Sequence, residues 1–327
     1  MPPTSTSLTP HRAGRDEQLR LALEDLQLGR WLSTKELLDH TPWAARTSRT
    51  QVLAVAAAQS DAVDAWYAED PGDANAAMMR ARVLTQRALV THRAGAVGDV
   101  LRRIRMARGA CDEAAVRWPA DPVPWVDQLA LAQLDLDARA AHRPEHWAAP
   151  PEAMLPRGPW PLLWEVSRRD PANREAYHRM LQCLQARGDG AVDFTRWVAS
   201  RVKPGSVLLT LPLYAYVDEF RQRNAGGQIS AGIGFWQNEM IQYYVGLARN
   251  SWFAYLTQPA EVSLLDLNYL AYTLTASGMA GAHWVFEAIG SFATPAPWRY
   301  VSKAGRYWED DFLQARAYAY RRRSART

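Results

Sequence analysis

The chain has 327 residues, of which 48% are apolar and 22% are charged, a balance typical of a folded globular protein. The net charge of +4 is small for this length, so long-range attraction to nucleic acid is not indicated. The longest nearly uncharged apolar stretch, Val207 to Val217, is far shorter than the ~20 residues that a transmembrane helix needs. We therefore expect a globular protein that does not span a membrane.

Residues 1–15 are rich in Pro, Thr and Ser and have no apolar core, so we expect a disordered start rather than a signal peptide or an anchor. The two cysteines, Cys111 and Cys183, lie far apart inside helical patterns and lack metal-site spacing. They are typical of small core residues in a reducing compartment. These features predict a cytoplasmic protein.

From about Glu17 to the end of the chain, apolar residues recur at helical spacing, and alternating stretches of β-branched residues are nearly absent. The pattern predicts an all-α fold built from stacked antiparallel helix pairs. The first pair is indicated by Leu19, Ala22 and Leu26 before Gly29, followed by Leu37 and Leu38.

Three breaks between helical stretches carry the same dipeptide, and a tryptophan precedes each of them by a few residues. The dipeptides are Asp70-Pro71, Asp121-Pro122 and Asp170-Pro171, spaced 51 and 49 residues apart, and the tryptophans are Trp66, Trp118 and Trp164. Proline suits a turn or the first helical position, and aspartate can cap free amides there. The repeated pattern predicts that each Asp-Pro lies at a junction between units, covered by the tryptophan.

The clearest unit runs from Asp170 through Asn173 and Tyr177 to Gly188-Asp189, and a second helix follows at Val192 to Val202. It resembles the tetratricopeptide repeat, with a Pro-x-Asn turn, an aromatic residue opening the first helix, and Gly-Asp between the helices. Weaker likenesses recur between Ala107 and Pro119 and between Leu267 and Pro295. The period near 50 departs from the ~34 residues of that family, so the fold is either such an α-solenoid or a less regular helical array.

We divide the chain into a helical-repeat region at 16–204, a carboxyl-terminal helical region at 205–320 and a basic tail at 321–327. Within the first region, six prolines between Pro144 and Pro161 predict a loop or short broken helices. In the second, Gly226-Gly227 marks a break before a long aromatic helix from Phe235 to Tyr255.

The carboxyl-terminal string from Phe286 to Gly290, followed by Thr294 and Pro297-Trp298, resembles the ending of uncharacterised bacterial helical-repeat proteins. That resemblance implies a bacterial origin and no particular activity.

Two enzymatic patterns fit poorly. His142, Glu145 and His146 have the H-x-x-E-H spacing of zinc peptidases, but Pro144 breaks the helix that would place both imidazoles on one face. Asp310-Asp311 resembles the aspartate-rich motif of terpene cyclases but lacks its final acid, so helix-start acids explain it better. We expect no metal and no cofactor.

Arg102, Arg105 and Arg108 lie on adjacent turns of one helical face and could bind phosphates, as could Arg321 to Arg323. Because no aromatic residues are interleaved with them, a solvated surface is the favoured interpretation. Nucleic acid is therefore not the expected partner.

We expect a non-catalytic scaffold or adaptor that binds a protein or peptide along the inner face of stacked helices. The resemblance implies that the first helix of each pair lines this groove, which makes the solvent-facing His178, Arg179 and Gln182 binding candidates. Asn238 and Gln242 are added because amides among aromatic residues suit recognition of a peptide main chain. The alternatives are an all-α enzyme with a dispersed site and a nucleic-acid-binding helical array.

Overall fold

The computed structural model describes residues 7–95, 97–136, 143–225, 234–258, 262–302 and 306–324. The chain divides into two compact units, one formed by Asp16–Phe194 and the other by Met1–Arg15 with Thr195–Thr327. The described residues form helices and no strand, apart from an isolated bridge between Ala148 and Gly158. The all-α prediction is confirmed.

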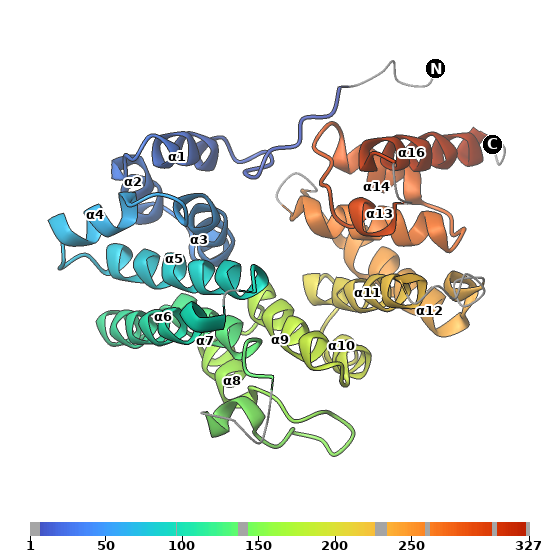
Figure 1. The fold of residues 1–327 in the computed structure, drawn as a ribbon. Coiled ribbons are helices and arrows are strands. Elements are labelled where there is room, and N and C mark those ends of the chain that lie inside the picture. Colours follow the sequence, from blue (N-terminus) through green and yellow to red (C-terminus); the bar gives the residue numbers. More distant parts are fainter. Residues whose placement is uncertain are drawn as a thin grey trace. The chain divides into compact units, whose positions relative to one another are not determined.

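The unit Asp16–Phe194 is a stack of helix pairs (Figure 1). Its helices are α1 (Glu17–Gln27), α2 (Leu32–Asp39), α3 (Trp43–Ala57), α4 (Ala62–Glu69), α5 (Ala74–Arg93), α6 (Val97–Arg117), α7 (Val123–Ala132), the 3-10 helix η1 (Pro144–Trp147), α8 (Trp160–Arg169), α9 (Arg174–Arg187) and the start of α10 (Ala191–Ala199). Helices α1, α3, α5, α7 and α9, here called the A helices, pack against one another in series. The even-numbered helices α2, α4, α6 and α8 each pack against one or two of them.

The Asp-Pro dipeptides lie between helices, as the sequence predicts. Helices α4 and α8 end at Asp70 and Asp170, and the side chains of Asp73 and Asn173 cap the helices that follow. The long spacing has two causes: α5 and α6 have 20 and 21 residues, whereas the next interval contains the proline-rich connector with η1.

The junction tryptophans differ from one another. Trp66 is fully buried and stacks on Trp31 with ring centroids 5.6 Å apart, and Trp118 lies 5.6 Å from Trp43. Trp164 is 41% exposed. The junction tryptophan is therefore fully buried at the first junction, whereas at the third it packs 6.1 Å from Trp160 and remains partly exposed.

The second unit is also helical. It contains η2 (Val207–Thr210), α11 (Leu211–Ala225), η4 (Phe235–Gln237), α12 (Glu239–Leu247), the π-helix η5 (Ala248–Trp252), η6 (Phe253–Tyr255), α13 (Leu264–Ala276), α14 (Ala282–Ile289), α15 (Trp298–Val301) and α16 (Trp308–Ser324). The single helix predicted from Phe235 to Tyr255 is wrong, because Asn238 is extended and caps α12 with its side chain, and the helical turns widen after Leu247. The predicted break at Gly226-Gly227 lies outside the described residues.

Residues 7–15 have fixed contacts. The Thr9 amide donates to the Ser291 carbonyl at 2.8 Å, and the Arg15 guanidinium donates to the carbonyls of Ala288 and Ile289 at the end of α14. Arg15 thereby supplies donors to carbonyls that have no partner within the helix, and the disorder expected for residues 1–15 stays a prediction.

Helix α16 extends to Ser324, so part of the expected basic tail continues a helix, and Arg322 donates to the Gly278 carbonyl at 2.7 Å. The division between the units falls within α10, before the boundary that we expected at residue 204. Among the described residues, no helix combines the length and apolarity required to cross a bilayer.

Candidate functional site

The A helices enclose four charged side chains, here called the charged cluster: Arg82 on α5, Asp127 on α7, and Glu175 and Arg179 on α9. Arg82 Nη1 donates to Asp127 Oδ1 at 2.8 Å and to Glu175 Oε1 at 3.0 Å, and its Nη2 contacts Glu175 Oε2. Arg179 Nη2 donates to Glu175 Oε1 at 2.9 Å. The two positive and two negative charges balance, which a buried ionic group requires.

The two carboxylates of the charged cluster differ in their electrostatics. Burial raises the pKa of Asp127 to about 6, although Arg82 acts in the opposite direction. Burial acts on Glu175 too, but Arg82 and Arg179 together outweigh it and lower the pKa of Glu175. Asp127 Oδ2 is buried and has no hydrogen-bond partner. This oxygen is thus an acceptor that the surrounding helices leave unused.

A second buried ion pair joins α3 to the start of α7. Arg46 donates through Nε and Nη2 to Asp121 Oδ2 at 2.9 and 2.7 Å, and its Nη2 also reaches Asn75 Oδ1 at 2.8 Å. Asp121 Oδ1 accepts the Val123 amide at 2.9 Å, so this aspartate binds a free amide at the start of α7, which the Asp-Pro position predicts. The guanidinium also lies 4.5 Å from the centre of the Trp118 ring.

A small hollow lies beside the charged cluster and is lined by A helices alone. Its lining residues, here called the inner-face depression, are Gln51 and Ala54 of α3, Arg82, Thr85, Gln86 and Leu89 of α5, Asp127 of α7, and Arg179 of α9. Its volume of about 10 Å³ is the size of one water molecule. The site presents amide, guanidinium and carboxylate groups from four successive A helices.

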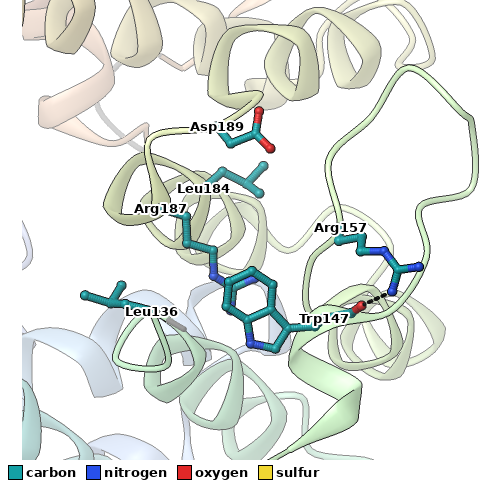
Figure 2. Close-up of a pocket in the computed structure, with 6 residues that line it drawn as sticks. All are labelled: Leu136, Trp147, Arg157, Leu184, Arg187 and Asp189. Atoms are coloured by element: carbon teal, nitrogen blue, oxygen red, sulfur yellow. Dashed lines mark hydrogen bonds between the residues drawn. The ribbon is translucent and has the colours of Figure 1, made fainter. Parts of the chain in front are cut away.

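A larger pocket of about 300 Å³ lies where the end of α7, η1, the proline-rich connector and the turn after α9 meet (Figure 2). Its lining, here called the Trp147 pocket, is Leu136, Trp147, Arg157, Leu184, Arg187 and Asp189. Leu184 is fully buried, and Leu136 is 48% exposed. The pocket combines an apolar wall with three charged groups.

Arg187 builds one side of the Trp147 pocket. Its Nη1 donates to the His146 carbonyl at 2.9 Å, its Nη2 donates to the Asp135 carbonyl at 3.1 Å, and its guanidinium carbon lies 3.7 Å from the centre of the Trp147 ring. Gly188 then adopts a left-handed conformation, with φ of 71°, and ends α9, which suits glycine. The Gly-Asp turn recognised in the sequence thereby carries Asp189 to the pocket.

The zinc-peptidase pattern gains no support at His146. Its Nδ1 lies 3.0 Å from Asp135 Oδ2, the side chain is buried, and burial lowers the pKa of His146. His142 lies outside the described residues. No group of three or more potential metal-ligating side chains occurs in the part of the chain that the structure describes.

The five candidate binding residues are distributed over both units. On α9, Gln182 is exposed and accepts from Arg179 Nη1 at 3.1 Å, and His178 is half-buried, with a pKa lowered far below its usual value by burial. The assumption that Arg179 faces solvent is wrong, because this side chain is only 9% exposed and pairs with Glu175.

In the other unit, Asn238 is exposed and its Oδ1 accepts the amides of Met240 and Ile241 at the start of α12. Gln242 is half-buried on the same helix. The role of Asn238 in the structure is thus that of a helix cap.

The arginines of α6 do not form one exposed stripe. Arg102 and Arg105 are exposed, whereas Arg108 is half-buried, and burial together with Arg143 lowers the pKa of Arg108. Only two of the three arginines expected on a phosphate-binding face are therefore exposed.

Sequence reasoning missed Arg82 and Asp127. Both are charged residues at positions where the helical pattern predicts an apolar one. Asp127 interrupts the mostly apolar stretch from Val123 to Ala132, and Arg82 lies one helical turn after the buried Met78 and Met79. Such charges are rarely fully buried unless they are paired. No protein-family model, curated protein or solved structure matches the chain.

Proposed function

We propose that the chain is a non-catalytic scaffold that binds a peptide or protein segment along the A helices of the unit Asp16–Phe194. The observation that carries the proposal is the inner-face depression, which takes its lining from α3, α5, α7 and α9 and from no even-numbered helix. A segment lying across this face would meet side chains from each helix pair in turn.

The chemistry of the inner-face depression suits a peptide main chain. Gln51 and Gln86 are half-buried amides with no hydrogen bond to another described residue, so each can donate and accept. Asp127 Oδ2 is an unpartnered acceptor beside a space for one water molecule. A water in that space can bridge this oxygen to an N–H of the bound segment.

Three finer interpretations belong to the same proposal. The serial packing of the A helices supports a tetratricopeptide-like stack, although its helices and connectors are longer than that family requires. The buried thiols of Cys111 and Cys183 support a reducing, cytoplasmic location. The bacterial origin implied by the segment from Phe286 to Gly290 belongs to the proposal as well.

A displayed library of random dodecapeptides, selected on the full chain, tests the proposal. Peptides that are enriched on the native chain should bind the Gln51→Ala/Gln86→Ala variant at least about tenfold more weakly, since two hydrogen bonds of about 1 kcal/mol each are lost. Gln27→Ala is the matched control, because Gln27 is an exposed amide at the end of α1. Arg179 is unsuitable for replacement because its loss would remove one of the two arginine partners of the buried Glu175.

Two results would contradict the proposal. One is a selection that enriches no peptide on the native chain above the level found with the double variant. The other is a set of enriched peptides whose affinity, measured by calorimetry, is equal for the native chain, the double variant and the control.

A further inference from the structure

The Trp147 pocket differs from the rest of its unit in the pairing of its arginines. Most arginines of this unit meet a carboxylate: Arg46 pairs with Asp121, Arg82 with Asp127 and Glu175, and Arg87 with Asp64. In the part of the chain that the structure describes, neither Arg157 nor Arg187 forms an ion pair. The pocket therefore has two guanidinium charges that no described carboxylate neutralises directly.

The charges that line the Trp147 pocket sum to a positive value. Arg187 donates only to backbone carbonyls at the end of α7 and in η1, and Arg157 makes one long contact, from Nη1 to the Trp147 carbonyl at 3.4 Å. Asp189 is exposed and likewise forms no ion pair among the described residues. Two cations against one anion favour a ligand that carries a negative charge.

The remaining walls of the Trp147 pocket are apolar. Leu136, Leu184 and the ring of Trp147 lie around the same space, as the sticks in Figure 2 show. Its volume of about 300 Å³ is at the lower end of the range for small-ligand sites. An apolar group of the size of a phenyl ring or a branched alkyl chain fits within this space and leaves room for a polar group attached to it.

We propose that the Trp147 pocket binds an organic anion in which a carboxylate is attached to a compact apolar body. The exposed guanidinium of Arg157 pairs with the carboxylate, for which its planar fork of donors is suited. The apolar body contacts Trp147, Leu136 and Leu184. This site is separate in its lining residues from the inner-face depression, so it does not depend on the proposed peptide binding.

The same chemistry has two sources: a free carboxylic acid, or an acidic side chain next to an apolar residue in another protein. Sodium 4-phenylbutyrate represents the first source, and the blocked dipeptide N-acetyl-Phe-Asp-amide represents the second. The neutral 4-phenylbutanol has the same apolar body without the charge. Each probe is titrated into the full chain, and saturation-transfer NMR reports which probe protons contact the protein.

We expect 4-phenylbutyrate or the blocked dipeptide to bind with a Kd on the order of 1 mM or tighter. The alcohol should bind at least about fivefold more weakly, because it loses the charge-assisted hydrogen bonds. Arg157→Gln should weaken the anionic probe about fivefold without affecting the fold, since Arg157 is exposed and makes a single long contact. Arg105→Gln, which removes an exposed arginine of α6, is the control and should leave the affinity unchanged.

The relative affinities of the free acid and the blocked dipeptide identify the source, and preference for either supports the shared chemistry. The proposal is overturned if the alcohol binds as well as both anions, if Arg157→Gln and Arg105→Gln have equal effects, or if neither anion gives a saturation-transfer signal. Since the peptide-library test uses Gln51 and Gln86, failure of one proposal can be told apart from failure of the other.

Discussion

The two units stabilise their interiors by different means. In Asp16–Phe194, successive A helices are joined by buried ion pairs, above all Arg82 with Asp127 and Glu175. In the other unit, aromatic rings meet edge to face: Phe312 lies 5.3 Å from Phe286 and 5.4 Å from Trp298, between centroids. Ion pairs require particular partners at particular distances, whereas aromatic packing mainly requires volume.

The difference has a physical consequence for how each unit tolerates change. A buried charge that loses its partner carries an uncompensated desolvation cost, whereas a lost ring leaves a cavity that neighbours can partly fill. We therefore expect the unit Asp16–Phe194 to lose stability when a buried charged side chain that is needed by its partners is replaced by a neutral one of the same shape. The aromatic core of the second unit should lose stability in proportion to the side-chain volume that a substitution removes.

The largest effect is expected for Glu175→Gln. The change preserves shape but leaves Arg82 and Arg179 without their shared carboxylate, so the free energy of unfolding should fall by about 3–5 kcal/mol. Denaturant titration gives the total loss, and amide hydrogen exchange shows whether it begins in α5, α7 and α9. Unchanged stability would mean that the ion pairs are not formed in solution.

The next effect is expected for Phe312→Ala in the second unit. Removing this fully buried ring should lower the free energy of unfolding by about 3 kcal/mol or more, through lost burial and a cavity beside Phe286 and Trp298. Phe312→Leu, which restores most of the volume, should recover much of that loss. If both variants are equally unstable, the ring-to-ring geometry matters more than volume, and the comparison between the units fails.

The smallest effect is expected for Asp127→Asn. The asparagine oxygen can still accept from Arg82, and its NH₂ replaces the unpartnered Oδ2, so stability at pH 7 should change by less than about 1 kcal/mol or rise. Denaturant titration of this variant beside Glu175→Gln separates the two carboxylates of the charged cluster.

The pH dependence of Asp127→Asn sharpens that contrast. In the folded chain the pKa of Asp127 is raised to about 6, above its ordinary value near 4. The folded chain therefore holds this proton more tightly than the unfolded chain does. The resulting stabilisation is complete below pH 4 and is lost as the pH rises through 6. Relative to the native chain, the asparagine variant should therefore become progressively more stable between pH 4 and pH 7. A constant difference across that range would contradict the raised pKa.

The helical fold and its junctions could be predicted because they depend on local signals. Spacing of apolar residues gives the helices, and Asp-Pro marks where they end, as at Asp70 and Asp170. The charged cluster could not be predicted, since Arg82 and Glu175 are 93 residues apart in the sequence and only the serial stacking of α5, α7 and α9 brings them together. Helical spacing alone predicts a solvent-facing Arg179, because it does not show that neighbouring helices bury this side chain beside Glu175, one turn away on α9.

The Trp147 pocket combines local features that the sequence predicts with a tertiary contact that it does not. The prolines between Pro144 and Pro161 predict a loop or short broken helices, and Gly188-Asp189 predicts the turn after α9. Their meeting around Trp147 depends on Arg187, whose donors bind carbonyls of the His146 and Asp135 backbone. No sequence pattern carries that tertiary contact.

Hydrogen exchange on the full chain with a library-selected peptide bound tests the proposed binding face most directly. The account predicts slower exchange in α3, α5, α7 and α9, the helices that line the inner-face depression, and unchanged exchange in α6 and α8. Protection confined to α6 and α8, or to Thr195–Thr327, would contradict it.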